Sequence, residues 1–408
     1  MLHIADPRER RLVAAADALL RVRAALGPLR TRVPRAEVKR ILVLRLERIG
    51  DLMMSLPALH ALGELAPNAA IDLVVGSWNE PLARLIPGIA RIETLDAGWL
   101  SRGTGSLGLR AVLARARQWR KPGYDLAVNL EGDIRSNALL AASGAQWLAG
   151  FGMAGGGPLL DTVADFDPAQ HTATHGVRLV REALGDERIV TVEPGVSALE
   201  TAAALPKVDL VIPAEALQRA AALLEPAGRT RPLVGAQIGA GRAVKMWPPA
   251  RYGDVAARLV ADTDAAIVLT GAVEDALAAR EFLARVPVSA TVVNLVGVPD
   301  LVTLAAVLSR LSVLITPDTG PMHLAAVLGT PIVGVFGPSS PDRWGPLARQ
   351  RRIVRIDLAC SPCNRIRRPP ERCVGHTPDC LEFIGVETVY QAARELLAAR
   401  TAGRRETP

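Results

Sequence analysis

The chain has 408 residues, half of them apolar, and carries a formal net charge of +7 from 48 Lys and Arg against 41 Asp and Glu. Its length exceeds one typical domain core, so we expect two domains. The absence of any run of about 18 apolar residues argues against a transmembrane helix, and frequent arginines near the N-terminus argue against a secretory signal. The expected compartment is therefore the cytoplasm.

Basic residues are concentrated in the first 40 positions, where leucine and valine interrupt them. This pattern suits a basic amphipathic helix lying on an anionic membrane surface, and a solvated charged face is the alternative. A second basic run, from Arg349 to Arg372, contains eight arginines. We do not expect a nucleic-acid partner, because aromatic residues make up only 3% of the chain and neither run contains stacking side chains.

Apolar runs and helical patterns alternate along the first half of the chain. We expect strands at Ile41–Leu46, Ile71–Val75, Asp125–Leu130 and Gln146–Phe151. We expect helices at Asp51–Leu65, Leu109–Trp119 and Ser136–Ala142. The stretch Gly150–Pro158 contains five glycines and is predicted to be a loop.

The same alternation continues through the second half. Strands are expected at Pro232–Gln237, Ala266–Thr270, Thr291–Leu295, Ser312–Ile315 and Ile332–Phe336. Helices are expected at Ala250–Ala261, Glu274–Val286, Leu301–Leu311 and Met322–Leu328, and a tail helix at Val386–Arg400 could return to the first domain. The pattern predicts an α/β chain of two Rossmann-like domains whose parallel sheets face a central cleft.

Four segments follow from this pattern. Residues 1–36 form a basic N-terminal extension, 37–205 the first Rossmann-like domain, 206–385 the second, and 386–408 a C-terminal helix and tail.

The stretch Pro317–His323 reads as a strand end that opens directly into a helix. Such a turn offers unpaired backbone N–H groups and the positive end of a helix dipole, which favour a phosphate. Thr319 can cap the helix, Gly320 allows close approach, and Pro321 suits the first helical position. The alternative is an ordinary capped helix in an α/β sheet.

Two further loops of the second half follow predicted strands. Gly239–Trp247 combines glycines with Lys245, a pattern suited to a phosphate. In Thr270–Asp275 a carboxylate such as Glu274 could bind ribose hydroxyls. Alternatively, the acidic residues of this loop could stabilise the positive end of the following helix dipole.

In the first half, Asp51 lies where a strand gives way to a helix. It is either a helix N-cap or a general base whose pKa is set by Arg45 or Arg48.

All the cysteines fall in one short window. Their clustering in a cytoplasmic chain suggests a structural zinc, with free thiols and redox use as alternatives. The four residues are Cys360, Cys363, Cys373 and Cys380. His171 and His175 are spaced for one helix face, and we prefer a helix-start or acceptor-side role for them over a metal site.

Four stretches, taken in order, resemble glycosyltransferase family 9, the heptosyltransferase family of lipopolysaccharide core assembly. They are Ile41–Leu62, Tyr124–Ser136, Lys245–Pro248 and Asp318–Pro338. The resemblance runs from about Val38 to Val389 and leaves the basic extension unmatched.

This resemblance implies a two-domain glycosyltransferase B-type fold, with the acceptor on the N-terminal domain and a nucleotide-sugar donor on the C-terminal domain. Asp51 aligns with the proposed catalytic base. The implied donor-binding residues are Lys245, Glu274, Asp318, Thr319, Gly320 and His323. The implied acceptor-binding residues are Glu131, Asp133 and Arg135.

The resemblance further implies an inverting transfer of heptose, or a related sugar, from an ADP-sugar to a lipopolysaccharide core or similar lipid-anchored saccharide. No cofactor is required for such catalysis. The enzyme would be peripheral on the inner face of the cytoplasmic membrane. The alternatives are a sugar-nucleotide epimerase of the same fold and a non-catalytic nucleotide-sugar-binding protein.

Overall fold

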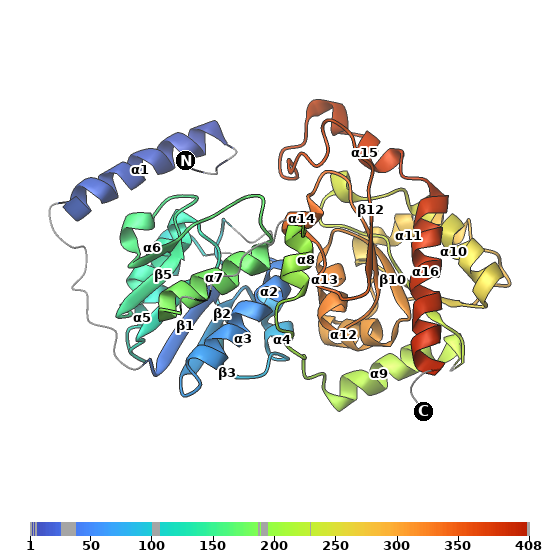
Figure 1. Cartoon of the computed structure of the whole chain (residues 1–408), viewed down its shortest axis with the longest axis horizontal. Coiled ribbons are helices and arrows are strands. Elements are labelled where there is room, and N and C mark those ends of the chain that lie inside the picture. The colour runs from blue at the N-terminus through green and yellow to red at the C-terminus, as the bar shows by residue number, and fades with distance from the viewer. Residues whose placement is uncertain are drawn as a thin grey trace. The chain divides into compact units, whose positions relative to one another are not determined.

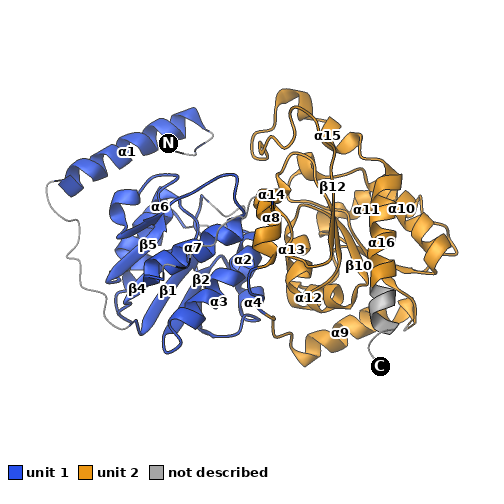
Figure 2. Cartoon of the chain, in the orientation of Figure 1, with its two compact units in different colours: residues 1–195, 205–208 blue, residues 196–204, 209–408 orange. Residues whose placement is uncertain are grey.

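A computed structural model describes residues 2, 4, 6–25, 38–99, 107–186, 188, 195–228 and 230–405 of the chain. The chain divides into two compact units, shown in blue and orange in Figure 2. Unit 1 comprises Met1–Gly195 and Leu205–Val208, and unit 2 comprises Val196–Ala204 and Asp209–Pro408. Positions 26–36 of the predicted basic extension lie outside the described residues.

The described part of unit 1 contains a six-stranded parallel sheet with the order β3-β2-β1-β4-β5-β6 (Figure 1). Its strands are β1 (Arg40–Arg45), β2 (Ala70–Val75), β3 (Ile89–Thr94), β4 (Leu126–Asn129), β5 (Trp147–Phe151) and β6 (Thr162–Ala164). β1 is apolar from Ile41 to Leu44 and buried throughout after its first residue, as expected of a central strand covered on both faces.

The helices of unit 1 pack around this sheet, except the first, which contacts the turn Gly157–Leu159. They are α1 (Pro7–Ala25), α2 (Ile49–Met54), α3 (Leu56–Leu65), α4 (Glu80–Ala83), α5 (Leu109–Gln118), α6 (Ile134–Ala142) and α7 (Thr172–Leu184), with 3₁₀ turns η1 (Ser77–Asn79) and η2 (Gly157–Leu159). Leu42 and Leu44 of β1 share a buried cluster with Val112 of α5 and Leu139 of α6. Because side chains alternate along a strand, Ile41 and Val43 face the opposite side of the sheet.

The described part of unit 2 repeats this architecture with the order β12-β11-β10-β7-β8-β9. All of its strand pairs are parallel. The strands are β7 (Leu233–Gln237), β8 (Ala266–Thr270), β9 (Val292–Asn294), β10 (Val313–Pro317), β11 (Ile332–Val335) and β12 (Arg351–Val354). The α/β class with two parallel sheets, predicted from the sequence, is therefore confirmed.

The principal helices of unit 2 are α8 (Ala198–Ala203), α9 (Ala214–Leu224), α10 (Pro249–Thr263), α11 (Ala276–Leu283), α12 (Leu301–Arg310), α13 (Gly320–Val327) and α16 (Val386–Arg405). Shorter elements are η3 (Glu225–Ala227), η4 (Ala243–Lys245), η5 (Val273–Asp275), α14 (Pro341–Trp344), η6 (Glu371–Cys373) and α15 (Asp379–Glu382).

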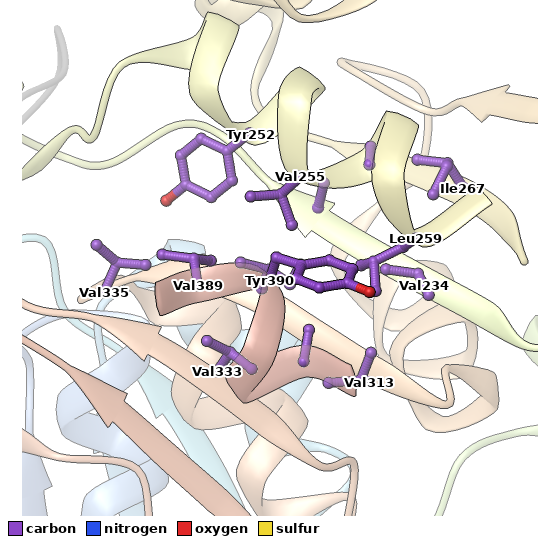
Figure 3. Close-up of a cluster of buried hydrophobic side chains, with 14 of the residues drawn as sticks. Val234, Tyr252, Val255, Leu259, Ile267, Val313, Val333, Val335, Val389 and Tyr390 are labelled. Carbon is purple, nitrogen blue, oxygen red and sulfur yellow. The ribbon is translucent and has the colours of Figure 1, made fainter. Parts of the chain in front are cut away.

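The tail helix α16 completes the core of unit 2. Val389 and Tyr390 of α16 lie among Leu259 of α10 and the strand residues Val313 and Val333 (Figure 3). α16 contacts α10, β10, β11 and β12. The tail helix thus packs on its own unit, and its expected return to the first domain is wrong.

The predicted central strands match the structure within two residues, but three strands were missed. These are β3, β6 and β12, and each lies at an edge of its sheet. Edge strands bury fewer side chains, so their sequences need no apolar run. Accordingly β3 and β12 mix charged and apolar residues. The helix expected over 51–65 is also interrupted, at Ser55.

Candidate functional site

Both sheets reverse their strand order at one point, between β1 and β4 in unit 1 and between β7 and β10 in unit 2. In open α/β sheets, the loops after two such neighbouring strands run to opposite faces of the sheet, and ligands bind in the crevice between these loops. The predicted site residues Asp51 and Glu131 follow β1 and β4, and Lys245 and Asp318 follow β7 and β10.

Arg45, the last residue of β1, connects the loops at this point in unit 1. Its side chain is only 3% exposed. The guanidinium donates to the Leu130 carbonyl oxygen at 2.7 Å and to the Asp51 carbonyl oxygen at 3.1 Å. It also forms ion pairs with Glu47 at 3.3 Å and with the Asp51 carboxylate at 3.5 Å. One buried cation therefore fixes the start of α2 against the end of β4.

Asp51 is the third residue of α2, and Arg48 occupies the N-cap position. Its Oδ2 accepts a hydrogen bond from the Arg48 N–H at 3.2 Å, so the carboxylate helps to start the helix without being the N-cap. The side chain keeps 23% exposure. A carboxylate held by Arg45 and still accessible is suited to receive a proton from a bound hydroxyl.

Two residues that were not predicted from the sequence hold the loop between β1 and α2. The Trp78 indole N–H and the Asn79 side-chain amide each donate to the Glu47 carbonyl oxygen at 2.9 Å. Both follow the end of β2, the strand beside β1. Their position after β2 could have identified them from the sequence, because the carboxyl ends of neighbouring parallel strands lie at the same edge of a sheet.

Glu131, just beyond β4, is almost completely buried, at 7% exposure. Its Oε1 accepts a hydrogen bond from the Leu46 N–H, and its Oε2 has no hydrogen-bond partner. Burial, as the largest cause, and the nearby Glu47 raise the pKa of Glu131 to about 8, and Arg45 only partly opposes them. We infer that Glu131 carries a proton near neutral pH and presents an O–H donor.

Asp133 and Arg135 form a local pair at the start of α6. Asp133 is the N-cap of α6, and its carboxylate accepts from the Arg135 N–H and from the guanidinium, both at 2.7 Å. Hydrogen bonding to Asp133 raises the pKa of Arg135. Arg135 also lies over the Trp99 ring, at 5.3 Å from its centroid. Both side chains are thus engaged in starting this helix, beside Glu131.

In unit 2 the structure brings Lys245, Asp318 and His323 together. Lys245 Nζ lies 3.0 Å from Asp318 Oδ2, and His323 Nε2 lies 3.8 Å from Asp318 Oδ1. Burial alone would raise the pKa of Asp318, but Lys245 and His323 outweigh it and hold that pKa well below its usual range. His323 Nδ1 is buried without a hydrogen-bond partner.

The turn after β10 differs in detail from the prediction. Thr319 is the N-cap of α13, but its side chain forms no capping hydrogen bond, so that expectation is wrong. The helix begins at Gly320, which makes Pro321 the second helical residue rather than the first. The Thr319 hydroxyl forms no hydrogen bond to the first turn of α13. The N-terminus of α13 is the positive end of its dipole, and it follows Asp318 directly.

The turn after β8 places Asp275, rather than Glu274, against the loop that follows β7. Glu274 is exposed, whereas Asp275 lies so close to Gly239 that a Cβ there would overlap its carboxylate. Burial raises the pKa of Asp275. A Cβ at position 239 would therefore displace the Asp275 carboxylate from its present place, and the sequence offered no sign of this contact.

Neither the histidines nor the cysteines form a metal centre in the described residues. His171 is the N-cap of α7 and accepts from the Ala173 N–H, which confirms its helix-start role. His175 stacks on Phe166 at 4.5 Å. The four cysteines are free, and the parts of the chain that the structure describes contain no group of three or more His, Cys, Asp or Glu arranged to hold a metal ion.

Comparison with known families identifies the class of protein. Residues 112–373 match the model of glycosyltransferase family 9 (heptosyltransferase), which is more than half of the chain. The chain belongs to glycosyltransferase family 9. It is therefore a glycosyltransferase, as the resemblance of its motifs implied.

No helix of the described residues is both long and apolar enough to cross a membrane.

Individual relatives agree with the family. Lipopolysaccharide heptosyltransferase 2 of Escherichia coli K12 is 28% identical over 327 residues, covering 78% of this chain and 88% of that protein. The structure of E. coli ADP-heptose lps heptosyltransferase II matches with a TM-score of 0.70 and 22% identity, over 89% of this chain and 99% of that chain. A family 9 glycosyltransferase from Veillonella parvula matches with a TM-score of 0.73 and 23% identity, over 90% of this chain and all of its own. The glycosyltransferase B-type fold is thereby confirmed.

The buried Glu131 predicts a pH dependence of stability that Glu131→Gln should remove. Between pH 4.5 and about 8 the folded chain keeps a proton on Glu131 that the unfolded chain releases. The free energy of unfolding should therefore fall as pH rises, by up to about 1.4 kcal/mol per pH unit from this group. Glutamine carries no such proton, so the variant should gain stability relative to wild type across this window.

Urea unfolding of both proteins at several pH values measures this difference. Glu64→Gln, which changes an exposed glutamate of α3 in the same unit and retains Glu131, is the control, and its stability should fall with pH as that of wild type does. A stability difference between wild type and Glu131→Gln that stays constant over the window would contradict a protonated Glu131.

Proposed function

We propose that this enzyme transfers heptose from an ADP-linked donor to a lipopolysaccharide core saccharide, with inversion at the anomeric carbon. The observation that carries the proposal is the Lys245–Asp318–His323 group at the start of α13, where the Lys245 ammonium and the His323 ring lie against one ionised carboxylate. The relatives named as lipopolysaccharide heptosyltransferases support this choice of substrates. The family favours transfer over the epimerase alternative.

On the donor side, the residues of unit 2 stabilise the leaving group. When the bond between the anomeric carbon and the phosphate oxygen breaks, negative charge develops on the departing ADP. Lys245 supplies positive charge for the diphosphate, and His323 and the N–H groups at Thr319 and Gly320 can donate hydrogen bonds to it. Asp318 accepts hydrogen bonds from sugar hydroxyls, and Glu274 or its neighbour Asp275 takes the ribose.

On the acceptor side, Asp51 acts as the general base. It removes the proton from the acceptor hydroxyl as that oxygen forms the new bond to the anomeric carbon. Arg45 holds the Asp51 carboxylate in place through its ion pair and through the Asp51 carbonyl. Glu131, Asp133 and Arg135 bind the acceptor saccharide, and the protonated Glu131 can donate to one of its oxygens.

Replacing Asp51 tests its role as the base. Asp51→Ala should lower kcat by at least about 100-fold, because proton removal then falls to water. Turnover on a defined acceptor is the measurement, and binding of ADP-sugar by thermal shift should remain unchanged. Asp96→Ala, which changes another carboxylate of unit 1 that caps a turn near Ser77, is a control for folding and should retain kcat. Near-normal turnover of Asp51→Ala would exclude Asp51 as the base.

Replacing Lys245 tests the donor site separately. Lys245→Met should raise the Kd for ADP-sugar by at least about tenfold, since a phosphate loses its charged partner. Lys245→Arg keeps the charge and should bind more tightly than the methionine variant. Lys121→Met, at an exposed lysine of unit 1, is the control. Equal affinity in all four proteins, including wild type, would rule out a donor contact by Lys245.

For the cysteine segment we keep structural zinc as a proposal. Burial, as the largest cause, and the nearby Cys363, Cys373 and Cys360 raise the pKa of Cys380 to about 11. Their present arrangement does not fit a metal ion, and no catalytic step depends on one. Protein purified without chelator should contain one zinc per chain, and a content well below that would reject the proposal.

The proposed location is the inner face of the cytoplasmic membrane, where a lipid-anchored acceptor would be presented. The arginine-rich first helix supports peripheral association with an anionic surface.

A further inference from the structure

The first helix, α1, is anchored to unit 1 by a buried carboxylate. Asp17 is 5% exposed, and its Oδ1 accepts a hydrogen bond from the Gly156 N–H at 2.8 Å. Its Oδ2 accepts from Arg21 at 3.0 Å. Val13 packs so closely on Gly155 that a Cβ there would lie 2.5 Å from Val13 Cγ1. This face of α1 therefore sits on the glycine-rich loop that follows β5.

That loop is connected by hydrogen bonds to the acceptor side of the site. Asn137 Nδ2 donates to the carbonyl oxygens of Phe151 and Gly155, each at 3.0 Å. Asn137 Oδ1 accepts from Asn129 Nδ2 at 2.6 Å, and Asn129 Oδ1 accepts from the Glu131 N–H at 3.1 Å. A continuous network thus leads from α1 through the loop to the backbone of Glu131.

A second contact joins α1 to the same region. Glu9 forms an ion pair with Arg135 at 3.3 Å, with both side chains partly exposed. Arg135 is the residue that pairs with the Asp133 cap of α6. Two points along α1, about two turns apart, therefore contact elements that carry predicted acceptor-binding residues.

The opposite face of α1 exposes three large apolar side chains among arginines. Leu12, Leu19 and Val22 are 73%, 75% and 62% exposed. Their spacing of seven and three residues places them on one side of the helix, away from Val13 and Asp17. The exposed Arg8 lies among them on the same face, and Arg11 and Arg23 lie at its borders. Such a face can place leucine and valine at a membrane interface while the arginines meet anionic headgroups.

We propose that α1 binds an anionic lipid surface through its outer face, while its inner face positions the predicted acceptor-binding residues between β4 and α6. One helix would thereby couple membrane docking to acceptor binding. The proposal rests on the proposed function for the lipid-anchored acceptor. Charge complementarity selects the lipid, since α1 carries five arginines against one Glu and one Asp. Leucine and valine side chains would enter the acyl boundary between the arginines.

Two sets of variants separate the faces of α1. Leu12→Ser with Leu19→Ser alters the outer face, and Asp17→Ala breaks the inner anchor. Ala18→Ser, an exposed position on the same helix, is the matched control. Each full-length protein is tested for flotation with phosphatidylglycerol-containing vesicles and with phosphatidylcholine vesicles. KM is measured for the acceptor embedded in vesicles and for the same acceptor after deacylation.

The outer-face variant should lose at least about tenfold in binding to anionic vesicles and show a similar rise in KM for the embedded acceptor only. Asp17→Ala should keep vesicle binding but raise KM several-fold for both acceptors, with the Kd for ADP-sugar unchanged. Wild-type binding should be weaker on phosphatidylcholine vesicles.

Three results would overturn the proposal: unchanged vesicle binding by the outer-face variant, an unchanged KM in Asp17→Ala, or concentration-dependent dimers of wild type that the outer-face variant abolishes. Failure of the proposed function would look different, because wild type would then bind vesicles normally and transfer no heptose to either acceptor.

Discussion

An ion-paired cation, fully buried in unit 1 and mostly buried in unit 2, lies where each sheet reverses its strand order, and the surrounding loops depend on it. Arg45 joins the end of β1 to the end of β4 and to α2, and Lys245 joins the loop after β7 to Asp318 after β10. A charge removed from water is tolerated only when partners compensate it. The pairing therefore fixes the loop positions, and the strand-end residues that face a ligand take their geometry from it.

The two cation sites differ in charge balance, and this difference matches their chemistry. In unit 1, Arg45 serves two carboxylates while Glu131 lies nearby, so one of the three acids keeps its proton. In unit 2, Lys245 and His323 surround Asp318 alone, which stays ionised. The first arrangement is consistent with the proposed role of Asp51 as a base beside a neutral hydrogen-bond donor. The second is consistent with the proposed diphosphate site, where Lys245 carries the positive charge.

Much of this arrangement could be predicted from the sequence, because buried central strands are apolar runs and the residues that follow them are candidate site residues by position. The edge strands β3, β6 and β12 could not, since little burial constrains their sequences. Hydrogen bonds from side chains to backbone carbonyls could not be predicted either. Examples are the bonds from Arg45 to the Leu130 carbonyl and from Trp78 to the Glu47 carbonyl. Such contacts depend on how two loops meet in space, which no spacing in the chain encodes.

The position of α16 affects the order in which the chain can fold during synthesis. All elements of unit 1 precede residue 209, so this unit can fold while the ribosome is still translating unit 2. The sheet of unit 2 lacks the Val389 and Tyr390 side chains in its core until the last helix has emerged. Nascent unit 2 therefore exposes an apolar sheet face for most of its translation, and it is the part of the enzyme that we expect to need chaperones.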